Sequence, residues 1–364
     1  MSDKNIKKPS ISLLSVDSPF SLADGKSYLP MAHGKATDEM AKMNSKNAEI
    51  DIVAGDATMQ KNGVTLVLNK FNDLQGAMNI GTHKLLSVAI AEFTKKNTHG
   101  VTTNLDYEVS IPFDDFIYNR GYDILERETN TPEEAEAEKK RIKNLKKEAR
   151  KTVGKELDVL HAAEISWKEK VKGQDGDFMN VSIIGTRGIK SGRIYMAFDP
   201  IMAKYLVQLP ITQYPIALLR VDGRNSNAYG IGLKMAEYFN LDRNIVQGRE
   251  DRLAVATLLA CTNLPTYEAV CASRKSWEER IKEPFENALD ELTACGVLSD
   301  WKYVKAKAKP LKEDEAANIT DYHTFESLYI QFDLPDALDH TRRIEANIEK
   351  AKEKAKKKAS KKKG

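Results

Sequence analysis

Basic side chains recur between residues 133 and 160 at spacings that a helix would gather on one face. Apolar residues in the same stretch lie three or four positions apart, which predicts one buried helical stripe on the other face. From Lys139 to Lys155 there are nine Lys or Arg residues and a single acid, Glu148. Such side chains bind phosphate oxygens and the acceptor edge of guanine, so this face is suited to a polyanion, although a solvated amphipathic helix would show the same pattern. The candidate contacts are Lys140, Lys143, Lys147, Arg150 and Lys151.

Two further groups of basic residues accompany predicted turns. The first is the turn RGIKSGR, in which Arg187, Lys190 and Arg193 are candidate contacts to phosphates, and a plain solvent-facing hairpin turn is the alternative. The second group lies at the start of another long helix and in the hairpin after it. Because the rest of that helix is acidic, we expect it to contribute through its N-terminus. This group is Arg274, Lys275, Arg280, Lys302 and Lys305, and the acids are Glu279, Glu283, Glu286, Asp290 and Glu291.

The positive charge is concentrated locally. The chain carries a net charge of +3, yet residues 341–364 hold eleven Lys or Arg and three Glu, which leaves −5 for residues 1–340. A generally basic protein would not show this contrast. The distribution favours a shaped, locally basic surface that meets a polyanion.

The elements around the first basic helix follow a definite order. Residues 1–60 lack periodicity and are predicted to be mostly disordered. A strand is expected from Val64, then a helix that Thr82 caps, a short strand before Pro112, and a helix that Gly121 ends. Pro132 begins the long basic helix, and strand-like runs follow it. Helix, strand, helix, helix and hairpin is the order of a winged helix-turn-helix, which we assign to residues 61–210.

Residues 211–338 repeat this order and are predicted to form a second winged helix. A long helix begins after a capping box of Ser276 with Glu279, is interrupted at Pro284, and is ended by Gly296. The segments IPFDDF and LPTYEA are expected to occupy the same place in the two units. The predicted fold is therefore α+β, with two tandem winged helices, a disordered N-terminal segment and a Lys-rich tail at residues 339–364.

Signatures of catalysis and metal binding are missing from the sequence. The six histidines form no H-x-H pair and no H-E-x-x-H, and GTRGIKSG has the wrong spacing for a phosphate-binding loop, so we predict no catalytic residues, metal site or cofactor. The three cysteines show no paired spacing, which favours a reducing compartment. No run of 18 apolar residues occurs, so we expect a cytoplasmic protein that does not bind membranes.

Several segments together resemble the two-winged-helix replication initiators of bacterial plasmids and related mobile elements. They are HKLLSVAIAEFT, VSIPFDDFIYNRG, the KTVGKELDVL end of the basic helix, the two IP/LP helix starts and DELTACGVLSDW, spread over residues 64–335. The resemblance implies sequence-specific binding of both units to double-stranded DNA repeats at a replication origin. It also implies recruitment of host replication proteins such as a helicase or initiator, and homodimers formed through the N-terminal unit. The acidic second long helix departs from this pattern.

Two other functions remain open on the sequence. A transcriptional or copy-number repressor of the same fold would bind DNA in the same way, and only origin melting or helicase loading would separate it from an initiator. A primase or nicking enzyme with an unfamiliar site is a third alternative, against which the missing ligand clusters argue.

Overall fold

A computed structural model of the chain describes residues 22, 27–44, 48–51, 54–171, 174–239, 252–305, 311 and 319–333. It has a mixed α+β fold, as predicted, with four antiparallel sheets among these residues. Residues 1–21 and the Lys-rich segment 339–364 lie outside the described residues. No helix of the described part is long and apolar enough to cross a membrane.

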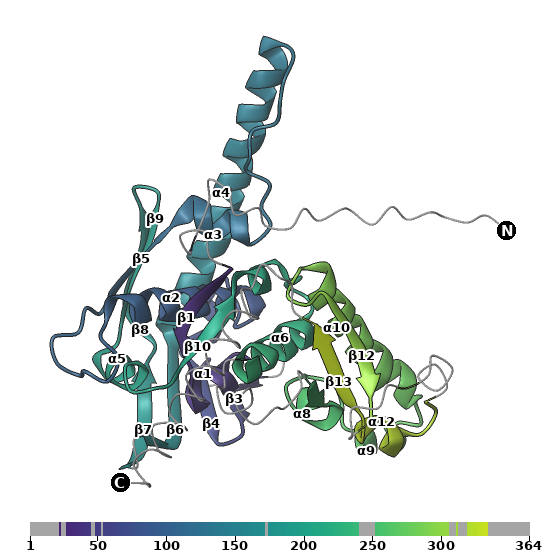
Figure 1. Cartoon of the computed structure of the whole chain (residues 1–364). Coiled ribbons are helices and arrows are strands. Elements are labelled where there is room, and N and C mark those ends of the chain that lie inside the picture. Colours follow the sequence, from purple (N-terminus) through teal and green to yellow (C-terminus); the bar gives the residue numbers. More distant parts are fainter. Residues whose placement is uncertain are drawn as a thin grey trace, which may run out of the picture.

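The first unit contains the element order that the sequence predicted. Strand β5 pairs with β9, and β9 pairs with β8, in an antiparallel sheet of order β5-β9-β8. Three helices accompany this sheet (Figure 1). The elements are α2 (Ile80–Lys96), β5 (Glu108–Pro112), α3 (Phe113–Asn119), α4 (Pro132–Ala162), β8 (Ile184–Lys190) and β9 (Arg193–Phe198).

Helix α2 starts earlier than the sequence suggested. Its cap is Asn79, whose side chain accepts a hydrogen bond from the Thr82 amide at 3.2 Å. Thr82 was the expected cap, but its hydroxyl donates to the Ala77 carbonyl at 2.8 Å instead. Asn is among the most effective N-cap residues, so the helix begins at Ile80, directly after Asn79.

Two strand-like runs after α4 form a sheet separate from the hairpin. Strand β6 follows α4 directly, and β6 and β7 extend a sheet of order β2-β3-β4-β6-β7. An aromatic cluster fastens it: the Trp167 ring stacks on Phe178 at 4.2 Å between centroids and meets Tyr205 edge-on at 4.8 Å. The elements are β2 (Glu49–Ile50), β3 (Ala57–Lys61), β4 (Val64–Leu68), η2 (Phe71–Asp73), β6 (Ala163–Val171), β7 (Gln174–Ser182) and α5 (Pro200–Leu206).

The prediction that residues 1–60 are disordered is wrong for the described part of that segment. Strand β1 (Tyr28–Ala32) pairs with β10 (Ile211–Pro215) in antiparallel register, and helix α1 (Lys35–Met40) packs against the first unit. Leu29 and Met40 are fully buried. Short elements with few apolar residues gave no periodic signal, and burial against distant parts of the chain supplies their stability.

The second unit has the same strand order as the first. Its sheet is β11-β13-β12, so the last strand again lies in the middle. The elements are η3 (Ile216–Arg220), α6 (Ser226–Phe239), β11 (Arg252–Ala254), α8 (Val255–Leu259), α9 (Tyr267–Ala272), the π-helical turn η4 (Glu278–Lys282), α10 (Glu283–Ala294), β12 (Asp300–Val304), α12 (Tyr322–Glu326) and β13 (Tyr329–Asp333).

The structure places the correspondence between the units at a different point from the IP/LP match. In each unit a strand leads directly into a helix. The backbone amide of the first helical residue donates a hydrogen bond to the carbonyl of the residue that precedes the middle strand of the sheet. The Phe113 amide donates to the Gly192 carbonyl, and the Val255 amide donates to the Leu328 carbonyl, both at 2.9 Å. The partner of the segment IPFDDF is therefore the β11–α8 junction, and LPTYEA lies in the connection that follows.

Helix α6 packs so closely on the end of α8 that a glycine is required. A Cβ on Gly230 would clash with the backbone carbonyl oxygen of Cys261. Gly230→Ala is expected to lower the free energy of unfolding by about 1–3 kcal/mol, since backbone cannot move aside as a flexible side chain does. Gly154→Ala in α4 is the matched control, since nothing lies within 4 Å of the new Cβ. It should raise the free energy of unfolding by about 0.5–1 kcal/mol, because alanine is the better helix former. Urea unfolding of both variants measures the difference, and equal effects would contradict the packing argument.

Candidate nucleic-acid interface

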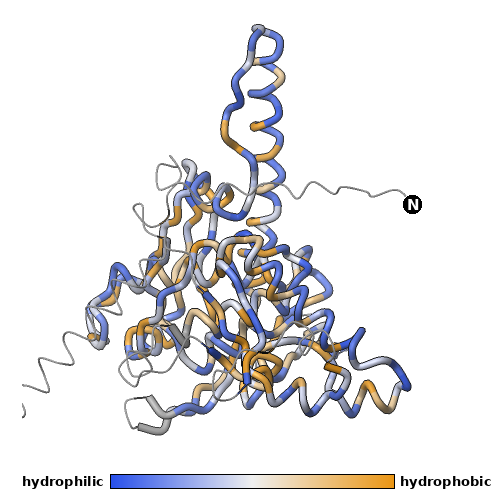
Figure 2. Tube along the Cα trace, turned by 45° about the vertical axis from the view of Figure 1, so that its right-hand side comes forward, coloured by the Kyte–Doolittle hydropathy of each residue, from blue (hydrophilic) through white to orange (hydrophobic). Residues whose placement is uncertain are grey.

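Helix α4 begins and runs as its sequence predicts. The Thr131 side chain accepts a hydrogen bond from the Glu134 amide at 3.2 Å, and Pro132 takes the first helical position. The buried stripe packs on α2 and β8. It consists of Ile142, Ala149, Val153, Glu156, Leu157, Val159 and Leu160. The N-terminal half of the helix projects from the body of the molecule (Figure 1), and the projecting part is mainly hydrophilic (Figure 2).

A buried ion pair holds the inner half of α4 in place. The Arg120 guanidinium, at the end of α3, donates two hydrogen bonds to the Glu156 carboxylate at 2.7 and 2.9 Å. Their side chains are 10% and 7% exposed. A Cβ on Gly81 of α2 would clash with this carboxylate, so three helices meet here without spare room. The pair therefore sets the position of α4 relative to α2 and α3.

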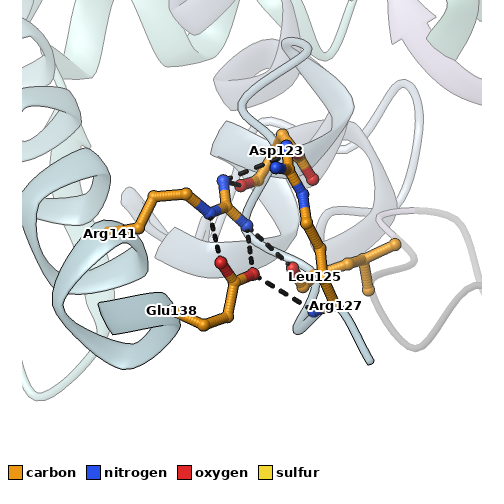
Figure 3. Close-up of polar contacts among 5 residues, drawn as sticks. All are labelled: Asp123, Leu125, Arg127, Glu138 and Arg141. Atoms are coloured by element: carbon orange, nitrogen blue, oxygen red, sulfur yellow. Dashed lines mark hydrogen bonds and ion pairs between the residues drawn. The ribbon is translucent and has the colours of Figure 1, made fainter. Parts of the chain in front are cut away.

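The outer half of α4 is braced by the loop that precedes it (Figure 3). The Arg141 guanidinium donates to the carbonyls of Asp123 and Leu125 at 2.7 and 3.1 Å and to both oxygens of Glu138 at 2.8 and 2.6 Å. The Arg127 amide also donates to Glu138, at 3.1 Å. The hydrogen bonds from Arg141 lower the pKa of Glu138 to about 2. Arg141 is thus occupied within the molecule and adds little to the outward basic face.

The predicted basic face of α4 is exposed, and its members differ in how they are held. Lys140, Lys143 and Lys147 are exposed and have no ion-pair partner among the described residues. Lys151 pairs with Glu148 at 3.0 Å on the surface. The Arg150 guanidinium lies over the Phe113 ring, 5.4 Å from its centroid, which orients it without neutralising it. The three free lysines form the centre of the face.

The hairpin between β8 and β9 turns where RGIKSGR predicts. Ser191 and Gly192 both have positive φ, 51° and 70°, as the two central residues of a type I′ hairpin turn require. Lys190 is exposed beside this turn. Arg187 pairs with Asp158 of α4 at 2.8 Å. Arg193 instead donates to the Ser110 hydroxyl and carbonyl, at 2.5 and 2.9 Å. Since β9 pairs with β5, these hydrogen bonds hold the two strands together, and the Arg193 guanidinium is directed at β5.

An open cleft between α4 and β8 was not anticipated from the sequence. It is lined by Gly154, Asp158 and His161 of α4 and by Gly185 and Gly188 of β8. A Cβ on any of the three glycines would meet nothing within 4 Å. Backbone is therefore accessible in this cleft, about two helical turns beyond Lys147 along α4, where a phosphate or base edge could approach closely. In the sequence, a glycine seven residues after Lys147 and three after Lys151 was the available signal for exposed backbone on this helix face. The cleft itself arises only because β8 packs beside Gly154.

Comparison with family models, with curated proteins and with solved structures finds no match to this chain.

The basic candidates of the second unit lie around the turn between α9 and the following helix. Arg274 and Lys275 are exposed in this turn, and Arg274 has a left-handed backbone with φ of 54°. Arg280 is exposed on η4, and Lys302 is exposed on β12. Lys305 is exposed just after β12. The structure thus brings these residues to the helix start and the hairpin, as the sequence indicated.

Three of the five acids on the second long helix have structural partners. Glu286 accepts from the Tyr303 hydroxyl and Asp290 from the Trp301 indole, each at 3.0 Å, so both fasten β12 to α10. Glu291 accepts from the backbone amide of Asp222 and from the side-chain amide of Asn225, both before α6. Glu279 and Glu283 remain exposed on the outer face. The donors are neutral, so these three carboxylates keep their charge, and the helix stays acidic beyond its N-terminal turn.

Proposed function

We propose that this chain binds double-stranded DNA, with the basic face of α4 in the major groove and the β8–β9 hairpin along the backbone. The observation that carries the proposal is the group Lys140, Lys143 and Lys147, which are exposed on one helix face and have no ion-pair partner among the described residues. Exposed cations without internal partners are available to neutralise phosphates or to donate to guanine.

The dimensions of this face support the proposal. From Lys140 to Lys151 the helix rises about 16 Å, at 1.5 Å per residue. That length matches roughly five base steps of B-DNA at 3.4 Å each. A helix fits the major groove, which is about 12 Å wide. The order helix, strand, helix, helix and hairpin in the first unit is typical of a winged helix-turn-helix domain, in which the third helix and the hairpin contact DNA, and the matching strand order of the second unit supports a tandem pair.

We further propose that the DNA is a set of origin repeats and that the protein initiates replication of a bacterial plasmid or mobile element. This part rests on the sequence resemblance, as do the homodimer and the recruitment of a host helicase or initiator. Repression of transcription or of copy number is the alternative that uses the same contacts.

Binding and role are tested separately. Fluorescence anisotropy with DNA that flanks the coding sequence should show binding to direct repeats at least about 10³-fold tighter than to random duplex at equal salt. Equal affinity for both would overturn sequence-specific binding. A plasmid that carries only this flanking region and no other origin should then replicate when the protein is supplied, whereas specific binding without replication would assign the repressor role.

Filling the glycine cleft should separate stability from binding. Gly154→Gln is expected to raise the free energy of unfolding by about 0.5 kcal/mol, because Gln is the better helix former and the site is open. The same side chain would occupy the cleft and weaken DNA binding by tenfold or more. Urea unfolding and anisotropy on one preparation measure both effects. Unchanged affinity would exclude the cleft from the interface, with Gly154→Ala as the smaller control.

Removal of residues 341–364 should weaken binding to every duplex alike. This segment carries a net charge of +8, and each phosphate contact it makes contributes about 0.9 to the slope of log affinity against log salt. We expect a shallower slope and an unchanged preference for the repeats. A slope equal to that of the full chain would show that the segment contacts something other than DNA.

A further inference from the structure

The hairpin turn between β3 and β4 contains the one Asn-Gly pair of the sequence, Asn62-Gly63. Lys61 and Val64 are opposite each other in the two strands, so Asn62 and Gly63 are the central residues of the turn. Both have positive φ, 49° and 75°, as a type I′ turn requires, and Asn-Gly is the preferred pair for it. Both residues are exposed, so the turn is open to water.

The backbone nitrogen of Gly63 is accessible to a base. Its N–H has no hydrogen-bond partner among the described residues, because the two central amides of such a turn lie outside the strand ladder. Glycine has no side chain that would shield this nitrogen. A Cβ on Gly63 would lie only 3.3 Å from the Lys35 Nζ. A positive charge therefore lies close to the atom on which negative charge develops when this amide loses its proton.

Helix α1 holds the side-chain amide of Asn62. The Nδ2 atom of Asn62 donates to Glu39 Oε2 at 2.9 Å, and Glu39 is only 8% exposed. The other oxygen of Glu39 pairs with Lys42 at 2.8 Å. The same turn reaches the second unit, where Lys61 Nζ donates to the Thr262 carbonyl at 3.3 Å. A carboxylate in place of the Asn62 amide would leave two like charges in contact at Glu39, with no donor between them.

We propose that Asn62 is a deamidation site and that its contact with Glu39 controls the rate. Hydroxide removes the proton of the Gly63 N–H, and this nitrogen attacks Cγ of Asn62. The new C–N bond closes a cyclic imide while the Cγ–Nδ2 bond breaks, and ammonia leaves with a proton from water. Water then opens the imide at either carbonyl, which leaves aspartate or isoaspartate at this position.

The reaction changes what holds the turn in place. The hydrogen bond from Asn62 to Glu39 has to break before the ring closes, so it slows the first step. The carboxylate that forms repels Glu39, so the product releases the turn from α1. None of these residues belongs to the proposed DNA interface, and the proposal is independent of DNA binding.

Mass spectrometry of the full-length protein tests the site. The protein is incubated at physiological temperature in mildly alkaline buffer and then digested at low pH, where ring closure is slow. The peptide that contains Asn62 should gain the mass difference between Asp and Asn and separate into aspartate and isoaspartate forms. Asn104 and Asn180 are matched controls, since both are exposed and have positive φ but precede Leu and Val, and they should stay unmodified. An unconverted Asn62, or equal conversion of all three, would overturn the proposal.

Two variants test the control by Glu39. Glu39→Ala removes the acceptor and should speed the conversion of Asn62 about tenfold, which is the contribution of one hydrogen bond to the barrier. Glu39→Gln keeps an oxygen acceptor and should convert at a rate close to that of the native protein. Thermal unfolding checks that both variants are folded at the incubation temperature. A folded Glu39→Ala that converts no faster than the native protein would overturn the role of Glu39.

Asn62→Asp reproduces one product and tests the release of the turn. It should lower the unfolding temperature by about 2–4 °C, as the loss of one hydrogen bond does in a protein of this size. Asn180→Asp is the control, because Asp keeps the oxygen that accepts from the Ser166 hydroxyl, and it should leave the unfolding temperature unchanged. Equal unfolding temperatures for Asn62→Asp and the native protein would contradict the repulsion at Glu39.

Discussion

Replacing Lys143 and Lys147 by alanine is expected to weaken binding to the specific DNA by about 2–6 kcal/mol, at about 1–3 kcal/mol for each side chain that reads a base. Both are exposed on α4 and have no ion-pair partner among the described residues. Their removal should therefore change the free energy of unfolding by no more than about 0.5 kcal/mol. Anisotropy at several salt concentrations, with urea unfolding alongside, measures both quantities.

The choice of these two lysines follows from the structure. Arg150 is an equally basic neighbour, but it stacks on Phe113, so its replacement would combine lost packing with lost binding. Lys204→Ala on α5 is the control, because it removes an exposed lysine from an element outside the proposed interface. If the double variant bound the repeats as tightly as the native protein, the assignment of α4 as the recognition helix would fail.

Loss of the Arg120–Glu156 pair should have the largest effect on stability. Glu156→Ala is expected to lower the free energy of unfolding by about 3–5 kcal/mol, because it leaves the Arg120 guanidinium buried without its counter-charge. Its two hydrogen bonds at 2.7 and 2.9 Å would both be lost. Chemical denaturation measures this loss, and DNA binding should weaken too, since the pair sets the position of α4.

A double variant shows whether charge or volume is responsible. Arg120→Met combined with Glu156→Leu removes both charges and keeps apolar volume, and such replacements of buried ion pairs are often nearly neutral. We expect the double variant to recover most of the stability that Glu156→Ala loses. A double variant as unstable as the single one would instead indicate that the hydrogen-bond geometry at the meeting of three helices is what matters.

Local signals in the sequence located α4 well. Thr131 and Pro132 mark its start, and the spacing of Ile142, Ala149 and Val153 identifies the buried stripe. Gly121 and Gly296 both have positive φ, 92° and 77°, at the helix ends where the sequence placed them. Caps, glycine turns and helical periodicity act within a few residues, which is why they could be predicted from the chain alone.

Pairings between distant segments could not be predicted in this way. Strand β1 finds its partner at β10, and β6 with β7 joins β4 rather than the hairpin. Strand patterns show that a segment can pair, but they contain little information about which of several strands it will meet.

The sequence by itself determined that a long helix would present one apolar and one basic face, because helical geometry converts spacing into direction. Only the tertiary structure decided which cations remain available. Arg141 donates to the carbonyls of Asp123 and Leu125, Lys146 pairs with Asp114, and Arg193 donates to Ser110, whereas Lys140, Lys143 and Lys147 are not paired among the described residues. An ion pair depends on which carboxylate the fold brings within about 4 Å, and that distance is set by packing between segments far apart in the chain.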